Sequence, residues 1–158
     1  MAIEQVRAYF QTYGLEKKII EFDVSSATVE LAARALGCEP KQIAKTLSFY
    51  DERGGALLIV AAGDAKVDNQ KFKERFAIKA KMLKAQEVEP LVGHAIGGVC
   101  PFGIRENVRV FLDVSLQRFD RVYPAAGSAN SAIALDIPSL QTYARSCGWV
   151  DVCKAWQE

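Results

Sequence analysis

Residues able to hold a metal or build a disulfide framework are scarce in this 158-residue chain. It has one histidine, His94, and four cysteines without CxxC or other metal-ligand spacing. A structural zinc site needs several such ligands at short, regular spacings. We therefore expect no metal and no cofactor, and reduced thiols of the kind found in cytoplasmic proteins.

Long apolar runs and a strong net charge are lacking as well. No apolar stretch approaches the ~20 residues needed to span a bilayer. The N-terminal MAIEQVRAYFQTYG carries charges in its first turns and has no apolar h-region, so it is a poor signal peptide. With a net charge of +1, the whole chain has no global attraction to nucleic acid. We expect a cytoplasmic protein with no membrane partner.

The pattern of hydrophobic residues predicts one mixed α/β domain over residues 1–158, with a mostly antiparallel central sheet and flanking helices. Half of the residues are hydrophobic, which is enough for a full core. Helices are expected over residues 2–13, 28–36, 68–77, 84–93 and 137–148. Strands are expected over residues 17–24, 42–51, 56–63, 108–116, 121–128 and 130–136, the second and third of them as a hairpin. The order does not match a regular βαβ dinucleotide fold.

Lys45 stands out within the strand IAKTLSF. Ile43, Lys45 and Leu47 alternate with Ala44, Thr46 and Ser48, so Lys45 shares a face with two apolar residues. A lysine on such a face is costly unless its amine reaches a partner or a cavity. It either extends to solvent at the strand end or supplies a cation at the floor of a pocket.

Two loops are rich in small residues, GGVCPFG (97–103) and AAGSANSAI (125–133). Small residues let the backbone approach a ligand closely and present main-chain N–H groups to it. Cys100 in the first loop is either an activated thiol or a small residue that fills space. His94 would have to take part in any triad, and there is no G-x-S-x-G elbow, P-loop or paired-carboxylate signature. A nucleophilic triad is therefore not expected.

The charges are unevenly distributed along the chain. Residues 71–84, KFKERFAIKAKMLK, contain six basic residues and one acidic residue. Such a stripe is either a solvated helix face or a surface that steers phosphate groups. Its lysines are Lys71, Lys73, Lys79, Lys81 and Lys84.

These motifs occur in an order that resembles a known family. TVELAARALG, AKTL around Lys45, GGVCPFG and AAGSANSAI resemble the YbaK-like aminoacyl-tRNA deacylases, free-standing relatives of the editing domain inserted in bacterial prolyl-tRNA synthetases. The resemblance covers essentially the whole chain. It implies a barrel-like sheet and hydrolysis of the ester that joins a wrong amino acid to the terminal adenosine of a tRNA. The partners it implies are the aminoacyl-tRNA acceptor end and a prolyl-tRNA synthetase.

The resemblance also assigns residues. It implies that Lys45 is the essential lysine, that Gly97 and Gly98 form the turn that stabilises the oxyanion, and that Pro101 fixes its shape. Water is then the nucleophile, and the lysine stripe contacts the acceptor stem. The predicted substrate-binding residues are Thr46, Val99, Cys100, Pro101, Phe102, Gly127, Ser128, Ala129 and Asn130.

The identity of the removed amino acid stays open between cysteine, alanine and similar small residues. Thr46 follows Lys45 where alanine-specific members often carry asparagine, so this chain is more similar to members with broader or cysteine-directed activity. Two other functions are compatible with the sequence. One is a module that binds aminoacyl or nucleotide ligands without turnover, and the other is an enzyme that depends on the Cys100 thiol.

Overall fold

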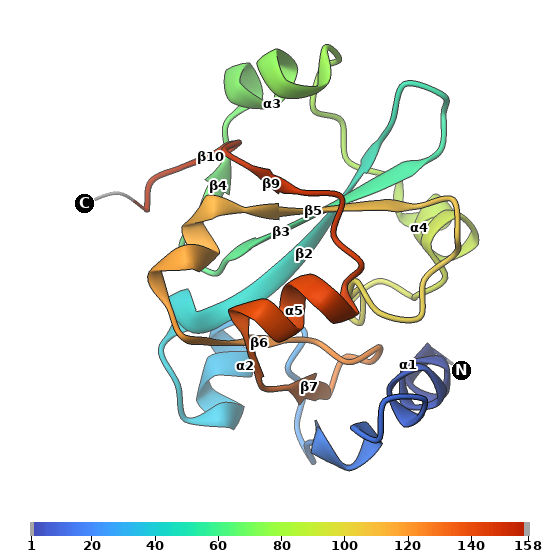
Figure 1. Ribbon diagram of the computed structural model, residues 1–158, viewed down its shortest axis with the longest axis vertical. Coiled ribbons are helices and arrows are strands. Elements are labelled where there is room, and N and C mark those ends of the chain that lie inside the picture. Colours follow the sequence, from blue (N-terminus) through green and yellow to red (C-terminus); the bar gives the residue numbers. More distant parts are fainter. Residues whose placement is uncertain (1, 157–158) are drawn as a thin grey trace.

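A hairpin of two long strands forms the centre of the protein, which is described over residues 2–156 by a computed structural model (Figure 1). Strands β2 (Ile43–Tyr50) and β3 (Ala56–Ala62) pair antiparallel from Ala44 and Ala62 to Tyr50 and Ala56. The turn between them is held by Asp51, whose carboxylate accepts hydrogen bonds from the Arg53 and Gly55 N–H groups. The predicted hairpin is thus confirmed.

Four further strands extend this hairpin into a mixed sheet that curls into a half-barrel, with the order β8-β6-β2-β3-β5-β9. The strands are β5 (Arg109–Asp113), β6 (Arg121–Pro124), β8 (Leu135–Asp136) and β9 (Trp149–Val150). The predicted mixed α/β class is confirmed. Within this sheet three of the five described pairings are parallel, because β6, β5 and β9 each join it after a long connection.

Two small antiparallel sheets complete the described strands. One pairs β1 (Ile19–Glu21) with β7 (Ser131–Ile133), and the other pairs β4 (Lys66–Val67) with β10 (Cys153–Lys154). The first joins residues more than a hundred positions apart, and so closes the fold around the segment that precedes the second helix. Counted over all three sheets, four of the seven described pairings are antiparallel.

The helices begin and end at the residues that capping chemistry favours. In α2 the Thr28 hydroxyl accepts a hydrogen bond from the Leu31 N–H, and Gly37 ends the helix in the left-handed conformation. Asp68 caps α3 in the same way. The helices are α1 (Ala2–Gln11), α2 (Val29–Leu36), α3 (Asn69–Phe76), α4 (Ala85–Val92) and α5 (Ile137–Tyr143), with 3-10 turns η1 (Glu16–Lys18), η2 (Pro40–Gln42) and η3 (Val114–Arg118).

Strand β3 lies at the centre of the core, and all seven of its residues are buried. A second packing centre joins α1 to the 97–103 loop, because the Phe10 ring lies 4.8 Å from the Phe102 ring, centroid to centroid. Both side chains are fully buried. The predicted strand over 108–116 ends earlier, at Asp113, because this side chain accepts a hydrogen bond from the Ser115 N–H and begins η3.

We expect Gly63→Ala to destabilise the protein strongly. Gly63 follows β3, and an added Cβ would lie 2.0 Å from the Pro40 carbonyl oxygen and 2.8 Å from Val29 Cγ1. Overpacking against backbone typically costs ~1–3 kcal/mol. Gly54→Ala is the comparison variant: Gly54 has open space around it, so its loss reports only the strain of an alanine at a φ of 79°. Urea unfolding should give the larger loss for Gly63→Ala. Equal losses would contradict this packing.

Candidate functional site

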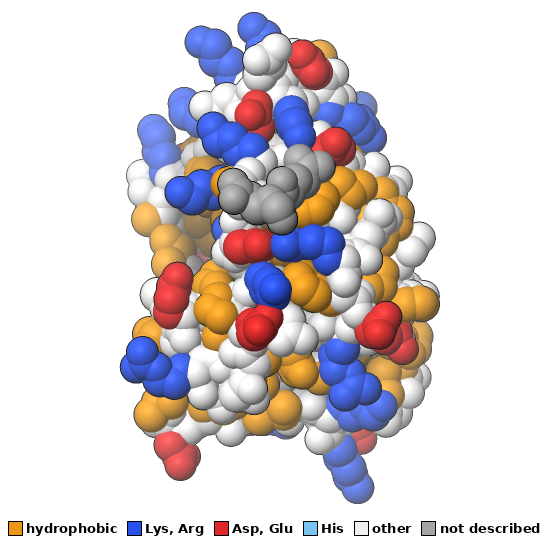
Figure 2. All heavy atoms as spheres, turned by 90° about the vertical axis from the view of Figure 1, so that its left-hand side faces the viewer, with side chains coloured by type: hydrophobic (Ala, Val, Ile, Leu, Met, Phe, Trp, Pro, Cys, Tyr) orange, Lys and Arg blue, Asp and Glu red, His pale blue; other side chains and the backbone are white. Residues whose placement is uncertain are grey.

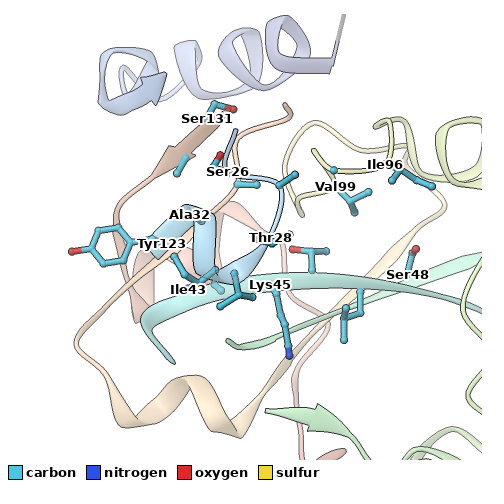
Figure 3. Close-up of a pocket in the computed structure, with 18 of the residues that line it drawn as sticks. Ser26, Thr28, Ala32, Ile43, Lys45, Ser48, Ile96, Val99, Tyr123 and Ser131 are labelled. Carbon is cyan, nitrogen blue, oxygen red and sulfur yellow. The ribbon is translucent and has the colours of Figure 1, made fainter. Parts of the chain in front are cut away.

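A cavity of about 460 Å³ opens beside β2. Its walls come from the segment that leads into α2, from β2 itself, from Met82 and Leu83, and from the loop after α4. Tyr123, Ser131 and Ala132 close the remaining side. Figure 3 shows these segments around the labelled side chains. The volume falls within the range of small-molecule sites, ~300–1,000 Å³.

One edge of β2 is unpaired where it borders this cavity. Parallel pairing with β6 covers only Ile43 and Ala44. The next contact on that edge is the bridge between Phe49 and Met82, beside a hydrogen bond from the Leu83 N–H to the Ser48 carbonyl. Residues 45–47 lie in the gap. The main chain of this gap is therefore available to a ligand.

Lys45 lies in this gap and lines the cavity. Its amine donates to the Gly63 carbonyl at 3.4 Å, a long contact, and it forms no ion pair with a described residue. In Figure 3 the amine lies on the side of β2 away from Ser131 and Val99. Burial lowers the pKa of the Lys45 amine, although Cys153 and Asp64 nearby act to raise it. This cation is half-buried and only weakly tethered.

Thr46 supplies an unsatisfied hydroxyl. Its Oγ1 is buried and has no hydrogen-bond partner among the described residues, and the residue lines the cavity. A buried hydroxyl without a partner costs free energy in the unliganded protein. Ser48, two positions further along the strand, is buried and lines the cavity as well. A polar ligand atom would find partners here.

The two small-residue loops are packed against each other. A Cβ on Gly98 would lie 2.7 Å from Ser128 Cα, so only glycine permits this approach. Gly98 itself does not line the cavity, and its N–H donates to the Ala95 carbonyl at 3.1 Å. Its amide is therefore already engaged, unlike the expectation that it would face the substrate. Gly97, with a φ of 93°, and Val99 do line the cavity.

The predicted residues 127–130 lie outside the cavity wall and hold one of its segments in place. None of Gly127, Ser128, Ala129 and Asn130 lines the cavity. The Asn130 amide donates to the Phe22 carbonyl, and the Ala129 carbonyl accepts from the Ser26 N–H. These bonds hold the segment before α2, whose Ser26 forms part of the wall.

Cys100 and His94 form a buried pair beneath the loop. His94 Nε2 lies 2.7 Å from the Phe102 carbonyl oxygen and 3.5 Å from Cys100 Sγ, and both side chains are fully buried. Burial raises the pKa of the Cys100 thiol to about 12. The thiol therefore stays protonated and is no activated nucleophile. Cys100, Pro101 and Phe102 do not line the cavity, so they shape the loop.

The lysine stripe divides into two parts. The Lys71 amine is held by the Asp151 carboxylate and the Cys153 carbonyl. Lys73, Lys79, Lys81 and Lys84 are exposed, and the last two flank Met82 and Leu83 at the cavity. Figure 2 shows Lys and Arg side chains gathered at the end of the molecule that carries α3.

Several wall residues were not predicted from the sequence. Ser26, Thr28 and Val29 belong to a helix start that is recognisable only as a cap. Met82 and Ile96 line the cavity and are 53% and 61% exposed. Their positions beside the lysine stripe and the glycine-rich loop could have indicated from the sequence that they belong to the site.

Neither a metal-binding cluster nor a membrane-spanning helix occurs among the described residues. Between residues 2 and 156, no three His, Cys, Asp or Glu side chains come together in a group that could hold a metal ion. No described helix is long and apolar enough to cross a membrane.

Comparison with known proteins identifies the class. Residues 24–143 match the model of the aminoacyl-tRNA editing domain, and the chain belongs to this family. It is 50% identical over 157 residues to the uncharacterized protein YwhH of Bacillus subtilis (strain 168), covering 99% of this chain and 100% of that protein. It is 28% identical over 109 residues to "Putative Cys-tRNA(Pro)/Cys-tRNA(Cys) deacylase EbsC" of Enterococcus faecalis (strain ATCC 700802 / V583), covering 68% of this chain and 66% of that one.

Solved structures agree with this family. The crystal structure described as "a putative trans-editing enzyme for prolyl tRNA synthetase" superposes with a TM-score of 0.86 at 28% identity, over 97% of each chain. The hypothetical protein APE2540 gives a TM-score of 0.84 at 27% identity, over 95% of this chain and 99% of that one. The resemblance expected from the motifs is thus confirmed.

We expect stability to depend on the protonation of His94, the only histidine in the chain. Burial lowers the pKa of His94, so the folded protein keeps the neutral ring while the unfolded chain takes up a proton below pH ~6.5. The free energy of unfolding should be highest above that pH and fall below it, with a slope approaching ~1.4 kcal/mol per pH unit.

The measurement is urea unfolding between pH values of about 7.5 and 5.5, where most carboxylates stay ionised. His94→Gln keeps an N–H donor for the Phe102 carbonyl but cannot titrate, so its stability should change less over this range. An NMR titration of the single imidazole in the folded protein gives its pKa directly. A value at or above that of a free histidine would be incompatible with the prediction.

Proposed function

We propose that this protein hydrolyses the ester between a small amino acid and the terminal adenosine of a mischarged tRNA. The observation that carries the proposal is the cavity beside the unpaired edge of β2, lined by Lys45, Thr46, Gly97 and Val99. It lies within the residues that match the editing-domain family. No histidine or cysteine of the described chain lines it, which favours water as the nucleophile.

The reaction requires that main-chain donors stabilise the oxyanion. Water adds to the ester carbonyl carbon, and the negative charge that develops on the carbonyl oxygen is bound by the N–H groups of Gly97 and Val99, the two residues of this turn that line the cavity. The carbon–oxygen bond to the ribose then breaks. The proton lost by water passes through the neighbouring ribose hydroxyl to the leaving oxygen, giving the free amino acid and the tRNA. Preorganised donors of this kind are worth ~10²–10³ in rate.

Lys45 contributes a cation with few competing contacts. Its amine is held by one long 3.4 Å bond to the Gly63 carbonyl and lies on the side of β2 away from Ser131 and Val99, so it meets a ligand that extends around the unpaired edge of β2 (Figure 3). Its role is to hold the substrate through the carbonyl, the amino-acid end or the terminal phosphate. Burial lowers the pKa of this amine, and a bound anion would act to raise it.

Selectivity for a small amino acid is part of the proposal. The wall beside the Thr46 hydroxyl is formed by Ala32, Ala44 and Ala132. The name of the EbsC relative supports cysteine as the amino acid that is removed. The description of the superposed structure supports tRNA(Pro) as the tRNA and a prolyl-tRNA synthetase as a partner. The proposal assigns Lys79, Lys81 and Lys84 to the acceptor stem; it is supported by Met82 and Leu83, which line the cavity within the same segment.

A deacylation panel tests the proposal. The protein is mixed with tRNA(Pro) charged with radiolabelled cysteine, alanine, serine or proline, and loss of label is followed with time. We expect rapid loss of at least one small residue, spared proline, and a drop of ~10²-fold or more for Lys45→Ala, since a desolvated positioning contact is removed.

Controls separate the alternatives. Lys41→Ala removes a lysine that pairs on the surface with Glu39 and should keep full activity. Cys100→Ser should retain most activity, whereas a thiol-dependent enzyme would lose it and tolerate Lys45→Ala better. If no ester is cleaved on any tRNA but the aminoacyl-tRNA still binds, the protein is a binding module and the hydrolase proposal fails.

The Thr46 hydroxyl should favour tRNAs charged with a polar amino acid over tRNAs charged with an apolar one. Thr46→Val removes the unpartnered buried hydroxyl at nearly constant volume, so the unliganded protein should become more stable. Cleavage of seryl- or cysteinyl-tRNA should fall by roughly 3- to 10-fold relative to alanyl-tRNA, the value of one hydrogen bond. Thr46→Ser should keep the wild-type ratio. A ratio that is unchanged in Thr46→Val would show that the hydroxyl makes no contact with the substrate.

A further inference from the structure

A second cavity, also about 460 Å³, lies on the other side of the loop after α4. Gly97 and Val99 line the first cavity, whereas Pro101, Gly103 and Ile104 line the second. The other walls of the second cavity come from α1, from the beginning of β5 and from the C-terminal end of α5. In Figure 1 these segments meet on the right, between α5 and α1.

The second cavity carries an excess of positive charge. Arg105, Arg109 and Arg145 line it, against a single acid, Glu106. The Arg109 guanidinium is paired with Glu52 at 2.9 Å, so its charge is largely neutralised. Arg105 is fixed by a 2.6 Å hydrogen bond from its Nε to the Pro90 carbonyl. Within the described part of the chain, neither Arg105 nor Arg145 forms an ion pair.

Arg145 occupies a backbone position that usually belongs to glycine. It follows the last turn of α5 with a φ of 50°, and the Arg145 and Ser146 N–H groups donate to the Thr142 and Gln141 carbonyls. This is a Schellman motif with its left-handed residue at Arg145. At the same place α2 and α4 have Gly37 and Gly93. A side chain here is disfavoured by the backbone, so its presence needs another reason.

The Arg145 side chain is directed over an aromatic wall. Its guanidinium carbon lies 5.2 Å from the centre of the Tyr9 ring. The Tyr9 hydroxyl donates to the Tyr143 carbonyl at 2.5 Å, which fixes one wall of the cavity. Tyr143, Ile104 and Val108 add ring and aliphatic surface. The volume is within the range for organic ligands, ~300–1,000 Å³, and much larger than an inorganic anion requires.

We propose that this second cavity binds a nucleotide, with Arg145 and Arg105 at its phosphate and the Tyr9–Tyr143 wall beside its base. Planar guanidinium groups suit phosphate oxygens, and tyrosine and arginine suit the flat face of a base. The nucleotide is either free in solution or an unpaired residue of an RNA chain, and the chemistry of recognition is the same. The inference does not depend on the proposed hydrolysis.

The test compares two variants that each gain a glycine at the end of a helix. One loses the arginine side chain and the other loses only a methyl group. Arg145→Gly and Ala77→Gly each place glycine at a left-handed position that ends a helix, α5 and α3 respectively. Both variants should keep or raise the thermal unfolding midpoint. Only Arg145→Gly removes a guanidinium from the second cavity. A lost affinity in that variant therefore cannot be attributed to a damaged fold.

Binding is measured by titration calorimetry at low ionic strength with AMP, inorganic phosphate and uncharged tRNA as probes. We expect AMP to bind more tightly than inorganic phosphate, and its Kd to rise by ~10-fold or more in Arg145→Gly, the value of a charge-assisted contact. Ala77→Gly should match the wild type. Another supporting result is that AMP fails to bind while tRNA binds, with a Kd that rises only in Arg145→Gly. In that case the nucleotide that the second cavity recognises is an unpaired residue of an RNA chain.

Two outcomes would overturn the inference. One is that none of the three probes binds the wild type. The other is that Arg145→Gly leaves every Kd unchanged, which would place any bound adenosine in the first cavity. The deacylation panel is a separate readout. A protein that binds AMP through Arg145 but cleaves no ester keeps this inference and loses the proposed function.

Discussion

The gap in strand pairing along β2 is the constraint on which the first cavity depends. Strand β6 ends at Pro124, which has no N–H to donate, and its pairing with β2 stops at Ala44. The edge becomes paired again only at Ser48, through the Leu83 N–H. Main-chain groups buried without partners are costly, so a gap of this kind is either hydrated or filled by a ligand. The unpartnered Thr46 hydroxyl lies in the same gap and adds to this requirement.

The remaining walls are rigid where they meet this gap. Gly98 contacts the backbone of Gly127 and Ser128, and the buried His94 ring holds the Phe102 carbonyl. The 97–103 loop is therefore fixed near its beginning and near its end before any ligand binds. A site that acts through fixed main-chain donors gains most from such ties, because little reorganisation accompanies the reaction. The high pKa of the Cys100 thiol agrees with a structural role for this buried side chain.

Local chemistry made part of the fold predictable from the sequence. The ends of α2 follow from Thr28 and Gly37, and the hairpin follows from two apolar runs joined by a short glycine-containing turn. The two-residue strands β4, β9 and β10 were missed, because the pairing of β10 with β4 and of β9 with β5 joins distant segments. Gly98 was expected to offer its amide, but its importance lies in the absent side chain. Such a close approach depends on which loop lies opposite, and spacing along the chain does not contain that information.

The loop between the two cavities acts as a shared wall that cannot move easily toward either side. Toward the 127–130 loop, a Cβ at Gly98 would already lie 2.7 Å from Ser128 Cα. Toward α1, a Cβ at Gly103 would lie 3.2 Å from the Gln5 carbonyl oxygen. Since both glycines are in close contact, a ligand in either cavity meets a preformed surface. Any coupling between the two cavities through this wall would act by making it stiffer and not by displacing it.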